Sequence, residues 1–272
     1  MTTPPLETRR EPRMRLAVGQ MDSGNDVGSN LRAIDALAAR ASRDGARLLV
    51  LPEYATYEKK AVDASFVEAA EALDGPVCTE LGRIAAAHSV ALVAGVIETG
   101  TQPGRAFNTL AAFSDTGELR TSYRKIHLFD AQGHAESDHI QPGPVRGPAV
   151  FELDGVRFGL QTCYDLRFPE HSRALADAGT DVLLICASWV PGPGKTRQWE
   201  VLTAARAIET CSFAIGACQS APVSVGHSTV VDPFGSVVGS LGVGPELLVV
   251  DIDPEQVGLA RRGFPVATQR RL

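Results

Sequence analysis

Strand-like and helix-like segments alternate along almost the whole chain, and this alternation limits the possible folds more than any other feature. Continuous apolar runs such as residues 47–51 and 181–189 are typical of buried parallel strands. Residues 107–128 and 149–162 each hold a turn sequence between two strand-like runs, which predicts hairpins. Because helix-connected and hairpin-connected strands occur together, we expect α/β layers with one mixed sheet or two sheets.

The hydrophobic periodicity predicts four helices, at residues 30–43, 77–88, 169–179 and 196–210. Asn30 is expected to cap the first of them. Strands are predicted at residues 14–20, 47–51, 90–98, 107–113, 119–128, 149–153, 156–162, 181–189, 212–219, 228–233, 236–239 and 246–252. The tail 261–272 carries four arginines and is too irregular to assign. Since no Pro/Ser-rich linker or short repeat divides the chain, we predict a single domain over residues 14–272.

Composition narrows the class of protein. The chain has 272 residues, 44% of them hydrophobic, which is ample for a substantial core, and its formal charge of −6 gives no reason to expect nucleic acid as a partner. Residues 1–13 mix Pro, Thr, Arg and Glu without an apolar core, so we interpret them as a disordered leader and not as a signal peptide. No apolar run approaches the ~20 residues of a membrane span. The predicted compartment is the cytoplasm.

The five cysteines are an odd number and include no Cys-x-x-Cys pair. An odd set cannot pair completely within one chain, and the spacing argues against a structural zinc site. Unpaired thiols suit a reducing compartment, where a single reactive cysteine can be kept ready. We predict neither a metal nor another cofactor.

Three polar residues follow directly on strand-like runs, namely Glu53, Lys125 and Cys163. In open α/β sheets the carboxyl ends of the strands line the binding crevice. A carboxylate, an ammonium group and a thiol that meet there would supply a base, an electrostatic stabiliser and a nucleophile. Taken singly, a free cysteine is more often a small buried apolar residue, and a Glu or Lys a solvated charge. The spacing alone does not show that the three residues meet.

Longer motifs surround these residues. The run CYDLRFPE from Cys163 resembles the nucleophile motif of the nitrilase superfamily, the carbon–nitrogen hydrolases. YRKIHLFD around Lys125 resembles the lysine motif of that family, and LPE at Glu53 its first glutamate motif. The motifs stand in the family's order, and similarity continues at 206–209 and 226–235. The resemblance covers nearly the whole chain.

The resemblance implies an α/β fold, the four-layer αββα sandwich of the nitrilase type. It implies that Cys163 is the nucleophile, Glu53 the general base and Lys125 the cation near the oxyanion. Glu136 matches the position of a second glutamate, and the backbone N–H of Tyr164 would belong to the oxyanion hole. Members of the family usually dimerise, often through the helix after the nucleophile and the C-terminal segment, so a homodimer or higher homo-oligomer is expected.

The form of the cysteine motif is most similar to the ω-amidase and deaminated-glutathione amidase branch. This similarity implies a hydrolase that cleaves the C–N bond of a small, carboxylate-bearing linear amide through a cysteine thioester, releasing ammonia and a carboxylic acid. A cation should then hold the substrate carboxylate, and Arg167, Lys195 and Arg197 are candidates by position. A small-molecule amide is thus the expected partner, with no nucleic acid and no membrane.

Within the superfamily, an N-carbamoyl amino acid or β-ureidopropionate amidohydrolase and a nitrilase are alternatives, and a catalytically inactive binding protein is an alternative outside it. A papain-like enzyme would use Cys163 with a histidine as base, but His127 lies inside the lysine motif and His227 inside the segment 226–235, so both have structural explanations. A metal could be held by His134, Asp138 and His139, although a polar loop of this kind is usually solvated. A substrate panel and a chelation test discriminate among these functions.

Overall fold

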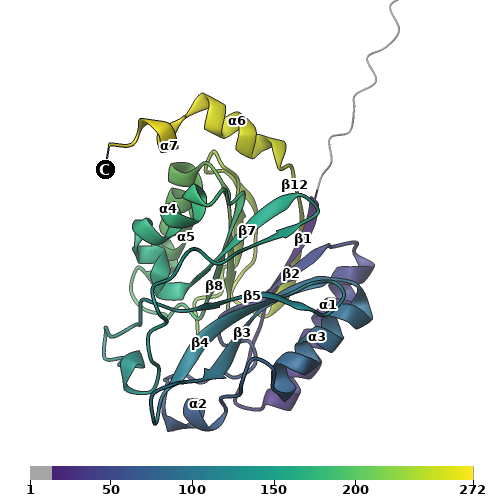
Figure 1. The fold of residues 1–272 in the computed structure, drawn as a ribbon, viewed down its shortest axis with the longest axis vertical. Helices are drawn as coiled ribbons and strands as arrows, with labels where there is room; N and C mark the ends of the chain where they lie inside the picture. The colour runs from purple at the N-terminus through teal and green to yellow at the C-terminus, as the bar shows by residue number, and fades with distance from the viewer. Residues whose placement is uncertain (1–13, 272) are drawn as a thin grey trace, which may run out of the picture.

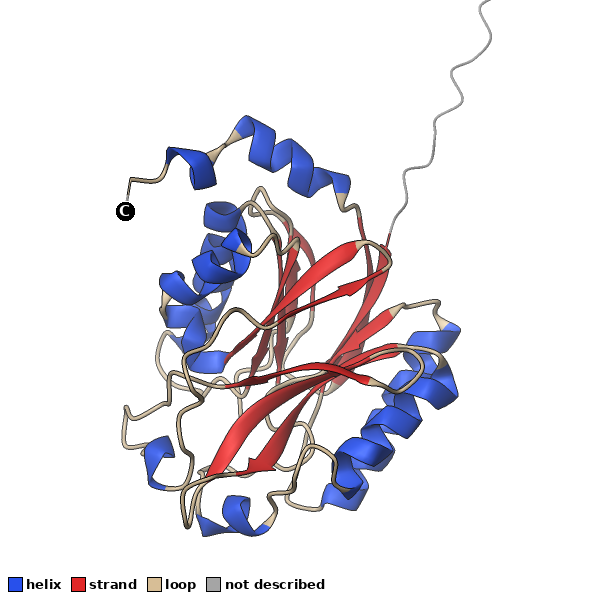
Figure 2. Cartoon of the chain, viewed as in Figure 1, coloured by secondary structure: helices blue, strands red, loops and turns tan. Residues whose placement is uncertain are grey.

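Two β-sheets pack face to face, and helices cover their outer faces (Figure 1, Figure 2). The computed structural model describes residues 14–271, so the predicted leader at 1–13 lies outside the described residues. Within them, the first six-stranded sheet has the order β12 (Glu246–Ile252), β1 (Met14–Gln20), β2 (Leu48–Val50), β3 (Ala91–Thr99), β4 (Ala106–Phe113) and β5 (Leu119–Arg124). The second six-stranded sheet in this part of the chain has the order β11 (Val237–Ser240), β10 (Thr229–Val231), β9 (Phe213–Cys218), β8 (Val182–Ala187), β7 (Val156–Thr162) and β6 (Val150–Leu153).

Two pairs of helices complete the four layers. One pair covers the first sheet, namely α1 (Val27–Arg43) and α3 (Pro76–His88). The other pair covers the second sheet, namely α4 (Pro169–Asp177) and α5 (Lys195–Thr210) (Figure 1). The predicted αββα sandwich is confirmed. No helix in the described chain is both long and apolar enough to cross a bilayer.

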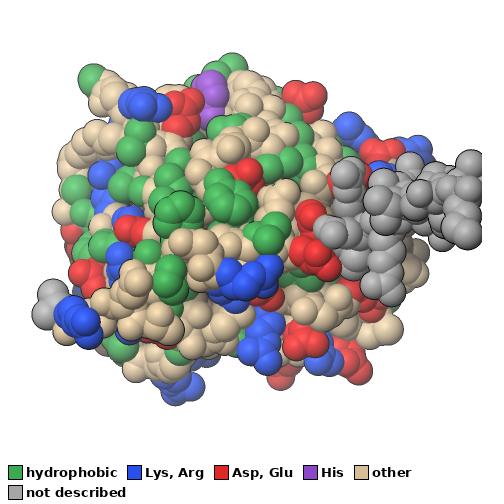
Figure 3. All heavy atoms as spheres, turned by 90° about the horizontal axis from the view of Figure 1, so that it is seen from above, with side chains coloured by type: hydrophobic (Ala, Val, Ile, Leu, Met, Phe, Trp, Pro, Cys, Tyr) green, Lys and Arg blue, Asp and Glu red, His purple; other side chains and the backbone are tan. Residues whose placement is uncertain are grey.

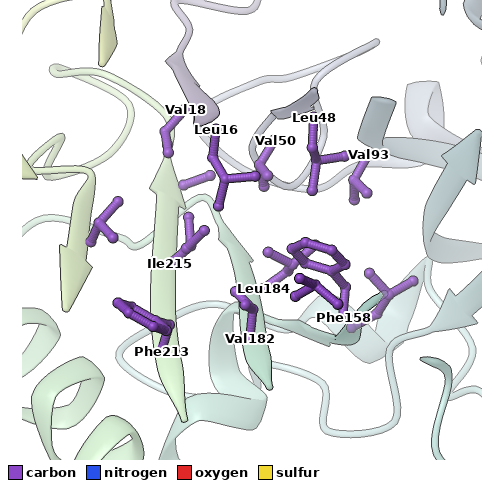
Figure 4. Close-up of a cluster of buried hydrophobic side chains, with 14 of the residues drawn as sticks. Leu16, Val18, Leu48, Val50, Val93, Phe158, Val182, Leu184, Phe213 and Ile215 are labelled. Atoms are coloured by element: carbon purple, nitrogen blue, oxygen red, sulfur yellow. The ribbon is translucent and has the colours of Figure 1, made fainter. Parts of the chain in front are cut away.

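The central strands of both sheets are buried on both faces, which explains their continuous apolar sequences. In β1, Leu16 and Val18 point between the sheets, whereas Ala17 packs beneath the helices of the first sheet. Figure 4 shows how side chains from the two sheets meet across this interface. The labelled members of the cluster are Leu16, Val18, Leu48, Val50, Val93, Phe158, Val182, Leu184, Phe213 and Ile215.

The topology brings several strand ends together. Strands β1, β2 and β3 run parallel in the first sheet, and β7, β8 and β9 run parallel in the second. Glu53 follows β2, Cys163 follows β7 and Ser188 follows β8, while Lys125 follows the antiparallel edge strand β5. The carboxyl ends of parallel strands from both sheets therefore contribute to one region of the molecule.

Helix α1 begins earlier than the sequence predicted, so the assignment of Asn30 as its cap was wrong. The carboxylate of Asp26 accepts a hydrogen bond from the Ser29 N–H at 2.6 Å and caps the helix before Val27. Asn30 lies inside the helix, and its amide donates to the carbonyls of Gly24 and Thr56 instead. A short acidic side chain four positions upstream was the better cap.

Other boundaries also differ. Strand β5 ends at Arg124 rather than at residue 128, because the chain turns after the Lys125 N–H donates to the Asn108 carbonyl at 2.9 Å. Three helices had no predicted counterpart, namely α2 (Ala64–Glu68), α6 (Glu255–Gly263) and α7 (Val266–Gln269). All three are short, so their sequences hold few periods of an apolar face.

We predict that Leu184→Ala lowers the free energy of unfolding by about 2–5 kcal/mol, because it leaves a cavity between the sheets where Leu184 is fully buried. The matched control is Leu119→Ala, whose side chain is 41% exposed and should cost less than about 1 kcal/mol. Urea unfolding followed by circular dichroism measures both. Equal losses of unfolding free energy in the two variants would contradict this description of the core.

Candidate active site

The Lys125 ammonium group lies buried between two carboxylates. Its Nζ is 2.9 Å from Oε1 of Glu53 and 2.8 Å from Oε2 of Glu136, and the three residues are 1–4% exposed. The other oxygen of Glu53 accepts the Ser188 N–H at 2.7 Å, so this carboxylate is tied to both sheets. The Asn108 amide donates to Oε1 of Glu53 at 2.7 Å. Such complete hydrogen bonding is what a buried ion group requires.

The loop that carries Glu53 packs directly on β3. A side chain at Gly95 would place its Cβ only 2.4 Å from the Tyr54 nitrogen and 2.7 Å from Cα of Glu53. The glycine is therefore needed for this close approach. Tyr54 adopts a φ of 58° in the turn that follows, and its side chain is 4% exposed.

Glu136 lies in the single turn Glu136–Asp138 of the long loop after β5. Its Oε1 accepts hydrogen bonds from the Tyr54 hydroxyl at 2.8 Å and the Asn108 amide at 3.0 Å. Its Oε2 accepts the Phe129 N–H at 2.7 Å in addition to the Lys125 ammonium. Glu136, the predicted second glutamate, thus accepts hydrogen bonds from four residues, one of which is Lys125.

Cys163 occupies a sharp turn directly after β7. Its φ is 44°, a left-handed conformation that is uncommon for a residue with a side chain. The Asp165 side chain reaches back to the Thr162 N–H and stabilises this turn. The thiol is 7% exposed, and its Sγ lies 3.7 Å from the Ser188 carbonyl. The geometry presents the sulfur at the end of the strand.

The Asp165 side chain accepts several hydrogen bonds that hold this turn. Its fully buried carboxylate accepts the Thr162 N–H at 2.9 Å and the Tyr123 hydroxyl at 2.7 Å on one oxygen. The other oxygen accepts the His127 N–H at 3.3 Å and lies 2.7 Å from His127 Nδ1. The lysine motif and the cysteine motif are therefore joined through this carboxylate.

The two histidines considered as a papain-type base do not serve the thiol. His127 is engaged with Asp165, and its ring stacks on Phe168 at 3.8 Å between centroids. The carbonyl of His227 accepts the Trp199 indole N–H. Neither histidine lines the cavity beside Cys163.

Burial and the neighbouring charges set the protonation of the central groups. Burial raises the pKa of the Cys163 thiol well above its usual value, Glu53 adds to the increase, and the Lys125 ammonium opposes it. For Lys125, burial favours the neutral amine, but the carboxylates of Glu136 and Glu53 raise its pKa well above the usual value. At neutral pH the thiol is protonated and the lysine charged.

A cavity of about 310 Å³ opens beside Cys163. Its lining comes mainly from the loops after β2, β5, β7 and β8, and includes Glu53, Tyr54, Glu58, Lys125, Phe129, Glu136, Cys163, Ser188 and Val190. A much smaller cavity shares Phe129, Cys163 and Val190 with it and extends to Tyr164, Trp189 and Lys195. A small ligand in the larger cavity would contact the thiol directly.

Tyr164, Arg167 and Lys195, which were predicted to contact the substrate, occupy different places. Lys195 is 3% exposed, and its Nζ lies 5.1 Å from the ring centre of Phe129 and 4.8 Å from that of Trp189. Burial lowers its pKa, and the nearby Arg167 lowers it further. Tyr164 lines the small cavity. Arg167 lines neither cavity, because its guanidinium is held by Gln198 at 2.6 Å over the Trp189 ring.

His134, Asp138 and His139 all line the larger cavity. Within residues 14–271, however, no group of three or more His, Cys, Asp or Glu side chains is arranged to hold a metal ion. The five cysteines all lie in this range, are buried and are unpaired. The arrangement at Cys163 can supply a nucleophile, a base and a fixed positive charge without a further group.

Comparison with known proteins agrees with this geometry. The model of the carbon-nitrogen hydrolase family matches residues 15–262. The chain belongs to this family, the nitrilase superfamily. A hydrolase of Mycobacterium tuberculosis is 41% identical to the present chain over 264 residues, which cover 91% of this chain and 92% of the mycobacterial protein. The deaminated glutathione amidase of Escherichia coli O157:H7 is 34% identical over 259 residues, covering 95% of this chain and 97% of that enzyme.

A solved structure of similar fold is that of a Nesterenkonia AN1 amidase of the nitrilase superfamily. It aligns to this hydrolase with a TM-score of 0.80 at 30% identity and covers 96% of this chain and 100% of that chain. The Nesterenkonia amidase has also been solved in complex with butyramide, and with acrylamide added to its active-site cysteine. This hydrolase is thus an amidase-type carbon–nitrogen hydrolase of the superfamily.

Several residues of the site were not predicted from the sequence. Asn108 stands in the mostly apolar strand β4, where a buried polar residue was the available signal. Asp165 lies inside the cysteine motif. Its role in joining this motif to Tyr123 and His127 of the lysine motif becomes clear only in the folded structure. Glu58 and Ser188 also line the cavity, Glu58 from the loop after β2 and Ser188 from the position directly after β8.

We predict that Asp165→Asn lowers the free energy of unfolding by about 2–4 kcal/mol and slows alkylation of Cys163. The reason is that the new amide N–H₂ group would face the buried donors that now bind the carboxylate. Asp22→Asn, at an exposed position, is the control. Thermal unfolding and the rate of iodoacetamide labelling at Cys163 measure the two effects. A variant that matches the control in both would show that Asp165 does not hold the turn.

Proposed function

We propose that this hydrolase is an amidase in which Cys163 is the nucleophile, Glu53 the general base and Lys125 the cation that stabilises the oxyanion. The observation that carries this proposal is the buried Lys125 ammonium, held between Glu53 and Glu136 at the cavity that contains the Cys163 thiol. No other site in the described chain joins a thiol, a carboxylate and a charged amine in this way.

In the acylation step, Glu53 takes the thiol proton as Cys163 Sγ attacks the amide carbonyl carbon. Because the pKa of the thiol is raised, attack needs this base. The new C–S bond gives a tetrahedral oxyanion, which faces the Lys125 ammonium and the Tyr164 N–H. The C–N bond then breaks as protonated Glu53 gives its proton to the departing nitrogen. Ammonia leaves, and the acyl group remains on sulfur as a thioester.

In the hydrolytic step, Glu53 takes a proton from a water molecule, whose oxygen attacks the thioester carbonyl carbon. The second oxyanion faces the same Lys125 ammonium. The C–S bond breaks, the sulfur takes the proton from Glu53, and the carboxylic acid is released. Glu136 is a positioning residue in both steps, because both of its carboxylate oxygens accept hydrogen bonds from the Lys125 ammonium.

For the substrate, we propose a small linear amide that carries a carboxylate. The support is the Lys195 ammonium beside Cys163, which is buried and takes part in none of the ion pairs found in residues 14–271. A buried cation without a counter-ion favours an anionic ligand. The similarity to a deaminated glutathione amidase agrees with this class. N-carbamoyl amino acids and nitriles are the alternatives within the superfamily.

We also propose that the hydrolase is a homodimer or higher homo-oligomer. Exposed apolar side chains on α5 and the neighbouring β11, among them Val201, Ile208 and Val237, support this. Leu259 of α6 and Phe264 after it are also more than half exposed. Figure 3 looks down on the end of the molecule that carries α6 and shows apolar side chains among the charged ones.

We also propose a cytoplasmic location, which the Cys163 thiol supports. The other four cysteines are buried, which protects them from oxidation, whereas Cys163 faces a cavity. A catalytic thiol of this kind is preserved best where the surroundings are reducing.

We predict that the wild-type enzyme releases ammonia from one or more of succinamate, α-ketoglutaramate, deaminated glutathione and butyramide, and that Cys163→Ala reduces kcat by at least about 10³-fold. N-carbamoyl amino acids and nitriles complete the panel. Turnover of the panel by both proteins, or by neither, would contradict the amidase proposal. Release of carbon dioxide with ammonia would move the enzyme to the carbamoyl branch.

Lys195→Met should raise KM for succinamate about tenfold or more and leave KM for butyramide nearly unchanged, because only succinamate has a carboxylate for the ammonium group. Lys195→Arg should restore much of the difference. Arg197→Met is the matched control on the same helix, where the Arg197 side chain is 78% exposed. If Lys195→Met changes KM for both substrates by the same factor, Lys195 does not bind the substrate carboxylate.

A further inference from the structure

The main-chain carbonyl of Glu53 is bound by a residue that takes no part in the chemical steps. The side-chain amide of Gln219 donates a hydrogen bond to this carbonyl at 3.0 Å, and among residues 14–271 no other protein group does so. Gln219 is 1% exposed and follows β9 in the second sheet, whereas Glu53 follows β2 in the first. The hydrogen bond therefore runs from one sheet to the loop of the other that carries the proposed base.

The Gln219 side chain is held in one orientation by Ser23. Its Oε1 accepts the Ser23 N–H at 3.2 Å, and its Nε2 donates to the Ser23 hydroxyl oxygen at 3.0 Å. A rotated amide would turn its oxygen to the Glu53 carbonyl and its N–H₂ group to the Ser23 N–H, so only the observed orientation pairs donors with acceptors. The Ser23 hydroxyl donates in turn to the Ala55 carbonyl at 3.0 Å. Gln219 and Ser23 together thus bind two carbonyls of the loop 53–55.

The main chain of Gln219 is fixed as well. Its N–H donates to the Ala187 carbonyl at 2.9 Å, and its carbonyl accepts the Gly226 N–H at 3.1 Å. Ala187 directly precedes Ser188, whose N–H donates to Oε2 of Glu53 at 2.7 Å. The residues that follow β8 and β9 therefore hold Glu53 at two places, its carboxylate and its carbonyl.

We propose that Gln219, together with Ser23, is a positioning residue for the general base. The inference rests on the proposed amidase function, in which Glu53 exchanges protons with the thiol, the departing nitrogen and water. Such transfers require hydrogen-bond geometry, so a small displacement of Glu53 lowers the rate. Gln219 lines neither cavity beside Cys163, so it acts through Glu53 and not on the substrate.

The first test is the effect of Gln219→Met, which keeps the approximate size of the side chain and removes its hydrogen bonds. It should lower kcat for the best amide of the panel about tenfold and change KM less than about twofold. Ser23→Ala, a smaller change to the same pair of residues, should lower kcat about threefold.

Gln141→Met is the matched control, because Gln141 binds a loop that holds no predicted site residue. The Gln141 side chain is 6% exposed, accepts the Thr101 N–H at 2.8 Å and donates to the Thr101 hydroxyl oxygen at 3.0 Å. The same substitution therefore removes the same kinds of hydrogen bond. Gln141→Met should leave kcat unchanged, and thermal unfolding confirms that each variant is folded at the assay temperature.

The second test asks whether Gln219 acts through Glu53, and it needs no turnover. Because Glu53 takes the thiol proton, Glu53→Gln should slow labelling of Cys163 by iodoacetamide about tenfold. Gln219→Met should slow labelling about fivefold when Glu53 is intact, and less than about twofold in protein that already carries Glu53→Gln. A residue that only stabilises the fold would slow labelling by the same factor in both proteins.

Three results would overturn the inference. They are an unchanged kcat in a folded Gln219→Met protein, an equal loss of kcat in Gln141→Met, and equal slowing of labelling by Gln219→Met with and without Glu53→Gln. A KM that rises while kcat is unchanged would also contradict it, because that result requires contact with the substrate.

Failure of this inference and failure of the amidase function are distinguishable. If Glu53→Gln slows labelling and Gln219→Met does not, only the role of Gln219 falls. If Glu53→Gln is labelled as fast as the wild type, Glu53 is not the base, and both fall. If no amide in the panel is hydrolysed, the amidase function fails, while the labelling rates still decide whether Gln219 positions Glu53.

Discussion

The buried ammonium group of Lys125 is the interaction on which the rest of the site depends. Removing one ammonium and two carboxylates from water costs several kcal/mol for each ion, and only short, complete hydrogen bonding offsets that cost. Asn108, Tyr54 and backbone N–H groups supply the remaining donors to Glu53 and Glu136. The result is a fixed positive charge beside a protonated thiol, at the place where an oxyanion would form.

The two-sheet architecture is what allows this cluster to exist. The first sheet contributes Glu53 and Lys125, and the second contributes Cys163 together with the Ser188 N–H that holds Glu53. The apolar interface between the sheets therefore sets the distance between the base and the nucleophile. This coupling explains why long-range packing, and not local sequence, positions the reacting groups.

The sequence predicted much of this arrangement, because apolar periodicity identifies strands and the residues that follow them. Glu53, Lys125, Glu136 and Cys163 do lie together, as the motifs implied. Asn108 and Glu58 were missed, since a polar residue in a strand or loop shows its partners only after the sheets pack. The terminal helices α6 and α7 were missed because short amphipathic segments owe their stability to tertiary contacts. The roles of the site residues stay predictions until they are measured.

The most direct measurement of the central claim is to trap the acyl-enzyme. Wild-type protein is mixed with an amide that it hydrolyses, quenched in acid within the first turnover, and analysed by intact mass and peptide mapping. The account predicts a mass increase equal to the acyl group, located on Cys163 and on none of the other four cysteines, and lost on treatment with hydroxylamine. An acyl group on another residue, or turnover with no acylated species at any quench time, would contradict it.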